Sequence, residues 1–535
     1  MASRFSLALI AAAGMAAAGI AAADPAFRDV SAECGIDFVH ANGATGGKNY
    51  YEVMGSGVAV LDFDGDGRLD VYCVTCVGPN RLYRNVGEFR FEEVPGAAGA
   101  ADEGYGMGAV AADADSDGDA DLYVTNFGAN ALYRNDGGRF ARVTAGAEDD
   151  RWGCGASFLD YDRDGVLDLY VVNYVQCAVP DTNVCPTEDG HRLYCGPRRY
   201  PRAADVLLRG LGDLRFEDVS EKAGVAGVSG RGLGVIAFDA DRDSWPDLYV
   251  ANDLDPNFLF RNLGDGTFEE IGILSGVSHS EDGMEESGMG VAAGDYDRDG
   301  WLDLFVTNYV NETNTLYHNE GDGFFLDVSA MTGVGPSSLP WISWGTEFLD
   351  WDLDGWPDLL VVNGHTESEP ELVDPTTTWK QRGFLYRNVG EGRFEDVTQS
   401  AAPALLAPRA SRAAAFGDLD DDGDIDVIVQ AQNAPLLVLR NTAADANWIG
   451  VSTRGSRSNR DGVGARVEVH TGDVTLVRER QAGGSYLSSN DPRLTFGLGS
   501  SAAVDSIVVA WPSGSTSVLR APAIGRYHEI VESED

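Results

Sequence analysis

Basic residues are scarce in this chain, and lysine is nearly absent. Among its 535 residues, 39 Lys and Arg stand against 85 Asp and Glu, so the formal net charge is −46 at pH 7. Such a charge excludes a nucleic-acid binder that relies on phosphate contacts, because protein and polymer would repel each other. Cations are the partners that this composition favours. Hydrophobic residues make up 44% of the chain, which is enough for a packed core.

The sequence also lacks the short motifs of several enzyme classes. It contains no Gly-x-Ser-x-Gly, no His-Glu-x-x-His and no phosphate-binding Gly-Lys motif. Because an absent motif argues only weakly, a secreted hydrolase or lyase, or an accessory subunit of one, stays open as an alternative.

Long hydrophobic runs are missing beyond the N-terminus. One apolar run follows Arg4, from Phe5 to Ala23, and it ends in three alanines. This pattern predicts a secretory signal peptide over residues 1–23 and a secreted or periplasmic protein. An uncleaved membrane anchor is the alternative, which we disfavour because the run is rich in alanine and only marginally long enough to span a bilayer.

Cysteine is absent after residue 195. The seven cysteines are Cys34, Cys73, Cys76, Cys154, Cys177, Cys185 and Cys195. In an exported protein we expect at least one oxidised pair, and the odd count leaves one thiol unpaired. Cys73-Val-Thr-Cys76 looks like a redox motif, but in a regular strand these two side chains point to opposite faces, so we favour a structural role.

What the chain does have is a repeat. One nonapeptide occurs seven times with Asp at positions 1, 3, 5 and 9, and we call these copies loops 1 to 7. They begin at Asp62, Asp113, Asp160, Asp239, Asp295, Asp350 and Asp418. A chain this long requires either several domains or one closed repeat array, and repeats at such intervals are typical of arrays and propellers.

Four strand patterns accompany each loop in a fixed order. A Gly-rich apolar strand precedes the loop, an alternating strand such as Leu167 to Val171 follows it, and two more follow as Leu-Tyr-Arg-Asn and Phe-x-acid-Val. Four strands per repeat predict one propeller blade, and seven repeats predict a seven-bladed β-propeller over residues 24–445. We attribute the glycines of the innermost strands to crowding around the central axis; they are Gly57, Gly108, Gly155, Gly234 and Gly290.

The Phe-x-acid-Val pattern indicates how the ring closes. It follows the loops of the first six repeats, with Phe140 beginning a variant copy, but none follows loop 7. Yet Phe27-Arg-Asp-Val30 stands before loop 1, where no blade has begun. We therefore expect the N-terminal strand to form the outer strand of the last blade, which would leave no open edge between the two ends of the ring.

The loops have the ligand pattern of a calcium site. Carboxylates at positions 1, 3 and 5 converge on one point if the chain curls tightly, a Gly at position 6 permits the turn, position 7 offers a backbone carbonyl, and position 9 closes the shell. Position 12 lies inside a strand, which excludes an EF-hand. A polar turn of solvated aspartates is the alternative, and seven copies in register make it improbable. The sequence thus predicts up to seven calcium ions, with these ligands: Asp62, Asp64, Asp66, Arg68 and Asp70; Asp113, Asp115, Asp117, Asp119 and Asp121; Asp160, Asp162, Asp164, Val166 and Asp168; Asp239, Asp241, Asp243, Trp245 and Asp247; Asp295, Asp297, Asp299, Trp301 and Asp303; Asp350, Asp352, Asp354, Trp356 and Asp358; Asp418, Asp420, Asp422, Asp424 and Asp426.

Loop 4 departs from the pattern. It has Ser244 at position 6 where the other loops have Gly. A side chain disfavours the backbone conformation that the turn needs, so we expect a strained turn and a weaker site.

These repeats resemble the FG-GAP or VCBS repeats of integrin α-subunit propellers. From Trp448 onward, the segments 458–467, 483–488, 494–499 and 509–514 resemble the ASPIC/UnbV domain of the cartilage acidic protein family, as do 38–43 and 54–57 near the start of the chain. The resemblance implies a secreted calcium-binding protein. Residues 446–535 contain short strands and Gly turns, which predict a small β-sandwich or barrel-like domain. Tyr194-Cys-Gly-Pro197 resembles a pattern of the same family and lies in the longest insertion, so we expect Cys185 to pair with Cys195.

The long insertions identify a candidate ligand face. They all fall in connections between strands 2 and 3 or between strand 4 and the next blade, opposite the calcium loops. Binding residues concentrate on long loops of rigid scaffolds, although each of these side chains could instead pack its own loop. We expect the following residues to share this surface: His40, Glu52, Tyr194, Arg198, Arg199, His279, Trp341, Trp344 and His365.

Together these features predict an exported, calcium-binding β-propeller that acts as a binding or adhesion module, with a protein or glycan ligand on the insertion face and structural calcium. Besides the hydrolase or lyase alternative, it could be a partner protein for a neighbouring enzyme or glycan assembly.

Overall fold

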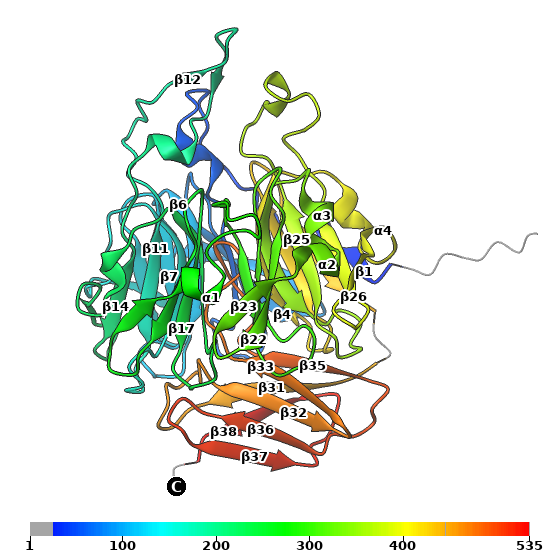
Figure 1. Ribbon diagram of the computed structural model, residues 1–535. Coiled ribbons are helices and arrows are strands. Elements are labelled where there is room, and N and C mark those ends of the chain that lie inside the picture. The colour runs from blue at the N-terminus through cyan, green and yellow to red at the C-terminus, as the bar shows by residue number, and fades with distance from the viewer. Residues whose placement is uncertain (1–24, 444–445, 534–535) are drawn as a thin grey trace, which may run out of the picture.

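The computed structural model describes residues 25–443 and 446–533, so the predicted signal peptide lies outside the described residues. Nearly all regular structure is β, as predicted, and the four α-helices of the described part are single turns: α1 (Gly272–Ser275), α2 (Ser329–Thr332), α3 (Val334–Ser338) and α4 (Thr398–Ala401). None of the helices in these ranges has the length and apolarity that a membrane crossing requires. Figure 1 shows a large propeller body with a smaller β-domain, coloured orange to red, beneath it.

The propeller consists of four-stranded antiparallel sheets, which we call blades and number along the chain. The described residues contain seven of them. Blades 1 to 3 are β2 (Val58–Leu61), β3 (Asp70–Cys73), β4 (Arg81–Gly87) and β5 (Arg90–Val94); β6 (Gly106–Ala112), β7 (Asp121–Asn126), β8 (Ala131–Asn135) and β9 (Phe140–Val143); and β10 (Gly153–Leu159), β11 (Asp168–Asn173), β14 (Val206–Gly210) and β15 (Phe216–Asp218). The predicted β-propeller fold is confirmed.

The later blades repeat this order. Blades 4 to 6 are β16 (Gly232–Phe238), β17 (Asp247–Asn252), β18 (Phe258–Asn262) and β19 (Phe268–Glu270); β20 (Val291–Gly294), β21 (Asp303–Val306), β22 (Thr315–Gly321) and β23 (Phe324–Asp327); and β24 (Ser343–Leu349), β25 (Asp358–Asn363), β26 (Phe384–Asn388) and β27 (Phe394–Asp396). Blade 7 combines β28 (Ser411–Gly417), β29 (Asp426–Ala431) and β30 (Leu437–Asn441) with the N-terminal β1 (Phe27–Asp29).

The two ends of the ring meet in blade 7. There β1 pairs antiparallel with β30, with Phe27 opposite Asn441. The Phe27 side chain is 1% exposed and packs in the core between blades 6 and 7. Because the outer strand of the last blade comes from the N-terminus, the ring is held closed by backbone hydrogen bonds between residues that are far apart in the sequence.

Alternating side chains fill the spaces between the blades. In β3, Val71 faces blade 7 and packs in a cluster with Ile428, whereas Tyr72 faces blade 2 and packs in a cluster with Leu122. Strands that are buried on both faces therefore carry apolar residues at nearly every position, which explains their continuous hydrophobic runs.

Crowding explains the glycines of the innermost strands, as predicted. A Cβ at Gly234 would lie 2.1 Å from the Met289 carbonyl oxygen, and one at Gly290 would lie 2.1 Å from the Trp344 carbonyl oxygen. At Gly57 the clash would be with the carbonyl oxygen of Leu487, at 2.4 Å. The last contact comes from the C-terminal domain rather than from a neighbouring blade.

The C-terminal domain is a two-sheet β-sandwich, as predicted. One sheet contains β31 (Asn447–Arg454) between β35 (Leu494–Gly499) and β38 (Tyr527–Val531). The other has the order β33 (Val474–Glu479), β32 (Arg466–Thr471), β36 (Ser506–Ala510) and β37 (Thr516–Arg520). Ile449, Val467 and Trp511 are among the buried residues of its core.

One segment leaves this sandwich and enters the centre of the propeller, where Figure 1 shows it among the blades. We call residues 482–489 the plug. Within it, β34 (Ser488–Ser489) pairs in parallel with the inner strand β2, and Ser485 forms a bridge with Val291 of blade 5. The Tyr486 side chain is 0% exposed and packs on Trp344, with 4.9 Å between ring centroids. The plug thus fills the axis with side chains, and nothing in our sequence analysis anticipated it.

Candidate functional site

The seven loops share one backbone conformation. Position 6 has a positive φ in every loop, from 70° at Ser244 to 107° at Gly118. Ser244 is a non-glycine residue in this region, so the predicted strain in loop 4 is confirmed. Position 4 is also left-handed in every loop, for example Arg163 at 55° and Arg298 at 64°. The sequence gives no signal for position 4, because only loop 1 has a glycine there.

Hydrogen bonds from the backbone orient the carboxylates. In loop 1 the Gly67 N–H donates to Asp62 Oδ2 at 2.8 Å, and the Arg68 N–H donates to Asp66 Oδ1 at 3.1 Å. The equivalent bonds in loop 5 join Gly300 to Asp295 at 3.1 Å and Trp301 to Asp299 at 2.8 Å. The position 1 and position 5 side chains are therefore directed inward before any ion binds.

The aspartate at position 9 connects the loop to the rest of its blade. Asp70 is 0% exposed; its Oδ2 accepts from the Phe63 N–H at 3.1 Å and its Oδ1 from the Asn85 N–H at 2.7 Å. Asn85 ends the Leu-Tyr-Arg-Asn strand, and its side-chain Nδ2 donates to the Leu419 carbonyl of loop 7 at 2.7 Å. The bond from the third strand to the position 9 aspartate recurs in the other blades. The side-chain bond to the preceding blade recurs in all of them except blade 3, where Gly210 stands in place of the asparagine.

The carboxylates of a loop lie close together, and several of their oxygens lack a partner. Possible metal-ligating atoms within 4.8 Å of one another come from Asp62, Asp64 and Asp66; from Asp113, Asp115 and Asp121; from Asp160, Asp162 and Asp168; and from Asp239, Asp241 and Asp247. Among the described residues, the buried Oδ1 atoms without a hydrogen-bond partner include those of Asp64, Asp113, Asp160, Asp162, Asp295, Asp350, Asp352 and Asp420. An all-oxygen set with unpaired buried oxygens fits a hard divalent cation.

Burial of the loop carboxylates in their charged form costs free energy unless a cation binds to them. It raises the pKa of Asp121 to about 8 and that of Asp70 to about 7, in each case against backbone hydrogen bonds that lower it. Burial also raises the pKa of Asp295, to about 8, with the charges of Asp303, Asp299 and Asp297 adding to the effect. A divalent ion would offset both the desolvation and the repulsion.

Arginines from the third strand neutralise part of this charge, which sequence analysis missed. Arg84 Nε lies 2.6 Å from Asp64 Oδ2, and its second nitrogen lies 3.0 Å from Asp66 Oδ2. Arg209 and Arg387 make the same pair of contacts in loops 3 and 6. The signal was present in the Leu-Tyr-Arg-Asn pattern, whose arginine precedes the asparagine that bonds to position 9.

Neighbouring loops are also joined to each other by cation–π contacts. Arg163 of loop 3 stacks over Trp245 of loop 4, with 4.7 Å from the guanidinium carbon to the ring centroid. Arg242 stacks over Trp301 at 4.9 Å, and Arg298 stacks over Trp356 at 3.6 Å. An arginine at position 4 thus contacts the tryptophan at position 7 of the next loop, which links loops 3 to 6 in series.

The C-terminal domain lies against this loop face. Arg493 donates to the Asp418 carbonyl at 2.7 Å and pairs with Asp421 at 2.6 Å. Arg460 pairs with Asp113 at 3.2 Å, and Arg466 donates to the Gly300 carbonyl at 2.8 Å. Further hydrogen bonds reach loops 4 and 6, so the domain contacts loops 2, 4, 5, 6 and 7.

The opposite face carries the insertions, at the top of Figure 1. Three of the predicted ligand-face residues lie in one network. Tyr194 Oη donates to Glu52 Oε2 at 3.0 Å, and the Tyr194 N–H donates to Glu367 Oε2 at 2.9 Å. The Glu367 N–H donates to His365 Nδ1 at 2.9 Å, and Lys48 forms an ion pair with Glu367. The network joins the segments around residues 50, 194 and 366.

Other members of the predicted set lie elsewhere. His40, beside Cys76, and Glu52 are each 1% exposed, and Trp344 is 0% exposed, so the prediction that these three share the open surface is wrong. Trp344 belongs to the inner strand β24, where its Nε1 donates to the Gly364 carbonyl at 2.7 Å. The others take separate positions: Arg198 is exposed and pairs with Glu285, Arg199 is exposed, His279 contacts Ser278, and Trp341 packs on Phe384.

The predicted Cys185–Cys195 disulfide is confirmed, with 5.3 Å between the Cα atoms. It links β12 (Cys185–Pro186) to the segment just after β13 (Arg192–Leu193), the strand with which β12 pairs. The remaining five cysteines carry free thiols. Burial raises the pKa of Cys76 to about 12, which fits a structural rather than a redox role for the Cys73-to-Cys76 motif.

Comparisons with known proteins agree with this architecture. The model of the FG-GAP-like repeat matches residues 62–124, 113–171, 239–306, 295–361 and 376–429, and the ASPIC and UnbV model matches residues 455–535. Cartilage acidic protein 1 of Homo sapiens is 29% identical over 340 residues, which are 62% of this chain and 48% of that protein. The Mus musculus protein is 29% identical over 341 residues, 62% of this chain and 49% of its own length. The chain thus spans about half the length of these curated relatives.

Similar solved structures are more distant. One is an Agrocybe aegerita lectin that recognises terminal N-acetylglucosamine, with a TM-score of 0.40, 15% identity, and coverage of 73% of this chain and 95% of that chain. Another is a rhamnogalacturonan lyase of Bacillus licheniformis, with a TM-score of 0.41, 11% identity, and coverage of 82% and 78%. Likenesses at this level carry no inference about ligand or activity.

Proposed function

Because the chain belongs to the family of FG-GAP-like repeat proteins and ends in an ASPIC and UnbV domain, we propose that it is an exported calcium-binding β-propeller that acts as a binding or adhesion module. The observation that carries the calcium proposal is the recurrence, in loop after loop, of inward carboxylates whose buried Oδ1 atoms have no partner among the described residues. Calcium accepts six to eight oxygen ligands and suits such a set.

In this proposal calcium serves the fold rather than a reaction. The C-terminal domain contacts five of the loops through hydrogen bonds, so a substrate would have little access to ions held there. The position 9 aspartate of loop 1 also accepts hydrogen bonds from Phe63 of its own loop and from Asn85 of the third strand. An ion in a loop would therefore stabilise a blade and the surface on which the domain sits.

The ligand, a protein or a glycan, would bind on the insertion face. Several large apolar side chains are exposed there, including Val179 at 73%, Val184 at 59% and Val373 at 64%. They belong to two insertions that the Tyr194–Glu367 hydrogen bond holds together. Exposed apolar groups on connected loops of a rigid scaffold are typical of interaction surfaces.

The calcium proposal is tested by counting bound ions. Elemental analysis after dialysis against calcium should give about one ion fewer for Asp64→Asn than for the parent protein, because loop 1 loses a charged ligand. Asp189→Asn removes the same charge from an exposed position outside the loops and should leave the count unchanged. Equal counts in all three proteins would refute calcium in loop 1.

The ligand face and export need separate measurements. Crystals soaked with panels of glycans and peptides should show density at the insertions, and Val373→Asp should abolish that binding without changing the calcium count. Density confined to other surfaces would refute the assigned face.

Export with signal cleavage predicts that the N-terminal sequence of the protein recovered outside the cytoplasm begins at Asp24. An intact segment 1–23 would contradict it.

A further inference from the structure

Blade 5 differs from the others at one position beside its loop. The third strand of each blade carries an asparagine, or a glycine in blade 3, next to the loop. The residue before it is arginine in six blades: Arg84, Arg134, Arg209, Arg261, Arg387 and Arg440. In blade 5 it is His318, on β22. The substitution replaces a permanent cation with an imidazole, which has a nitrogen that can bind a metal.

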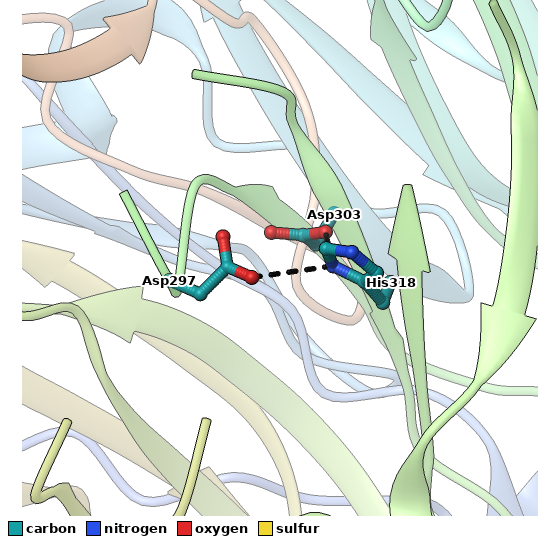
Figure 2. Close-up of side chains that lie close together, drawn as sticks. All are labelled: Asp297, Asp303 and His318. Carbon is teal, nitrogen blue, oxygen red and sulfur yellow. Dashed lines mark ion pairs between the residues drawn. The ribbon is translucent and has the colours of Figure 1, made fainter. Parts of the chain in front are cut away.

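The imidazole also occupies a different place from the arginines. Arg387 contacts Asp352 at position 3 and Asp354 at position 5 of loop 6. His318 Nδ1 instead lies 3.4 Å from Asp297 Oδ2 at position 3 and 3.2 Å from Asp303 Oδ1 at position 9. Figure 2 shows the ring directed between these two carboxylates. The nitrogen therefore lies within the ligand set.

These spacings suit a compact metal shell. The ligating atoms of Asp297, Asp303 and His318 lie within 4.8 Å of one another. Two ligands about 2.1 Å from the same zinc ion in tetrahedral geometry are roughly 3.4 Å apart, which is close to the separations in loop 5. Asp303 is held in place, since its Oδ1 accepts from the Asn319 N–H at 2.8 Å and its Oδ2 from the Tyr296 N–H at 3.1 Å.

A fourth group points to the same place. Asp295 is 3% exposed, and its Oδ1 has no hydrogen-bond partner among the described residues. Asp295 holds position 1 of loop 5, and in loops 2, 3 and 4 the aspartates at positions 1, 3 and 9 offer ligand atoms within 4.8 Å of one another. A buried, unpaired carboxylate oxygen beside a nitrogen and two further carboxylates is a donor set that suits a divalent cation.

We propose that loop 5, with His318, is a mixed nitrogen and oxygen site for a borderline divalent transition metal of the zinc type, held by Asp295, Asp297, Asp303 and His318. Calcium prefers oxygen ligands alone, whereas imidazole favours zinc and related ions. The inference rests on the proposed function, because it gives one of the seven loops a different ion.

Cobalt(II) is the probe, because its visible absorption reports nitrogen ligation and low coordination number. The chelator-stripped full chain is dialysed against excess calcium and titrated with cobalt. One equivalent should bind with visible bands, and added zinc should remove them. His318→Arg gives blade 5 the side chain of the other six blades and should weaken cobalt binding at least 100-fold, with an unchanged melting temperature.

The reciprocal variant tests whether the histidine is sufficient. Arg387→His places an imidazole beside Asp352 and Asp358 of loop 6 and should add a second cobalt equivalent. Cobalt titrations that are identical for the parent protein and His318→Arg would overturn the proposal, as would a calcium-loaded parent that binds no cobalt. Elemental analysis of calcium in the same samples distinguishes failure of the calcium proposal from failure of the proposed transition-metal site. A His318-dependent cobalt site without calcium elsewhere would refute the proposed function alone, and seven calcium ions without cobalt would refute this inference alone.

Discussion

The two faces of the propeller are built on opposite principles. On the loop face, the same backbone bonds recur from blade to blade, as in Gly67 to Asp62 and Gly300 to Asp295, and a second domain lies against the result. On the insertion face no pattern repeats, and the segments are joined by single contacts such as Tyr194 to Glu367 and Arg198 to Glu285. The repeated contacts belong to the part of the molecule that holds the fold, and the irregular connections form the face on which we propose that a ligand binds.

Removing the ions should have the largest effect, because it acts on the loop face as a whole. Excess chelator should lower the melting temperature by more than 10 °C, since each empty loop holds buried carboxylates that repel one another. An ion at about 100 times its dissociation constant stabilises the fold by up to roughly 2.7 kcal/mol per site. Differential scanning fluorimetry across free calcium concentrations measures this.

Calcium added back in excess should restore the melting temperature, and this serves as the control. A melting temperature that saturating chelator leaves unmoved would remove the basis for structural calcium and with it the contrast between the two faces.

The plug connects the two faces, and Tyr486 tests that connection. Tyr486→Ala should destabilise the protein by about 3–5 kcal/mol, because a fully buried aromatic ring on the axis is lost. Tyr486→Phe keeps the ring and loses the hydroxyl bonds to Met54, at 3.3 Å to its carbonyl and 3.9 Å to its Sδ, so it should cost about 1 kcal/mol. Urea unfolding measures both. Equal stabilities for the two variants would mean that the ring does not hold the axis.

The repeated part of the molecule was predictable because each copy of the repeat must adopt the same backbone conformation. Aspartates at fixed positions predicted the loops, and Phe27 before the first blade predicted the strand that pairs with Asn441. The plug was not predictable, since Tyr486 meets Trp344 only after two domains have folded against each other. Trp344 was misplaced for a related reason: the chain position of an insertion boundary does not show whether a side chain turns inward to the axis.

The loop contacts were predictable only in part. A glycine at position 6 is visible in the sequence, whereas the left-handed position 4 is occupied by residues such as Arg298 and Leu353, which carry no turn signal. The arginine of the third strand was visible as a pattern, but its partner Asp64 is a neighbour only in space. Side-chain pairs between strands depend on register, which a local motif does not specify.

The disulfide tests whether the insertion face is independent of the loop face. Its bond closes a loop with a sequence separation of 10, for which chain entropy gives roughly 2–3 kcal/mol. Cys185→Ser combined with Cys195→Ser should leave the melting temperature of the propeller unchanged and make trypsin cleave at Arg192 at least tenfold faster. Cys34→Ser, which alters a free buried thiol, should not change the cleavage rate. A global loss of stability in the double variant would show that the insertion supports the ring.

The smallest expected effect lies in the C-terminal domain, at Glu532. Burial alone would raise its pKa, but hydrogen bonds from the Ser513 hydroxyl and from the N–H groups of Ser458, Arg457 and Ser456 outweigh burial and lower the pKa to about 2. Because the folded pKa lies below the ordinary value of 4.5, the carboxylate contributes stability above about pH 4.5 and loses it as the pH falls toward 2.

Glu532→Gln should therefore be about 1 kcal/mol less stable than the parent at pH 7, and this difference should shrink to nearly zero near pH 2. The difference between the two proteins is the quantity to measure, by urea unfolding at each pH, because protonation of the loop aspartates affects both equally and cancels. A difference that stays constant from pH 7 to pH 2 would show that the charge of Glu532 does not hold the turn at residues 456–458, and that acid acts on this protein through the loop face alone.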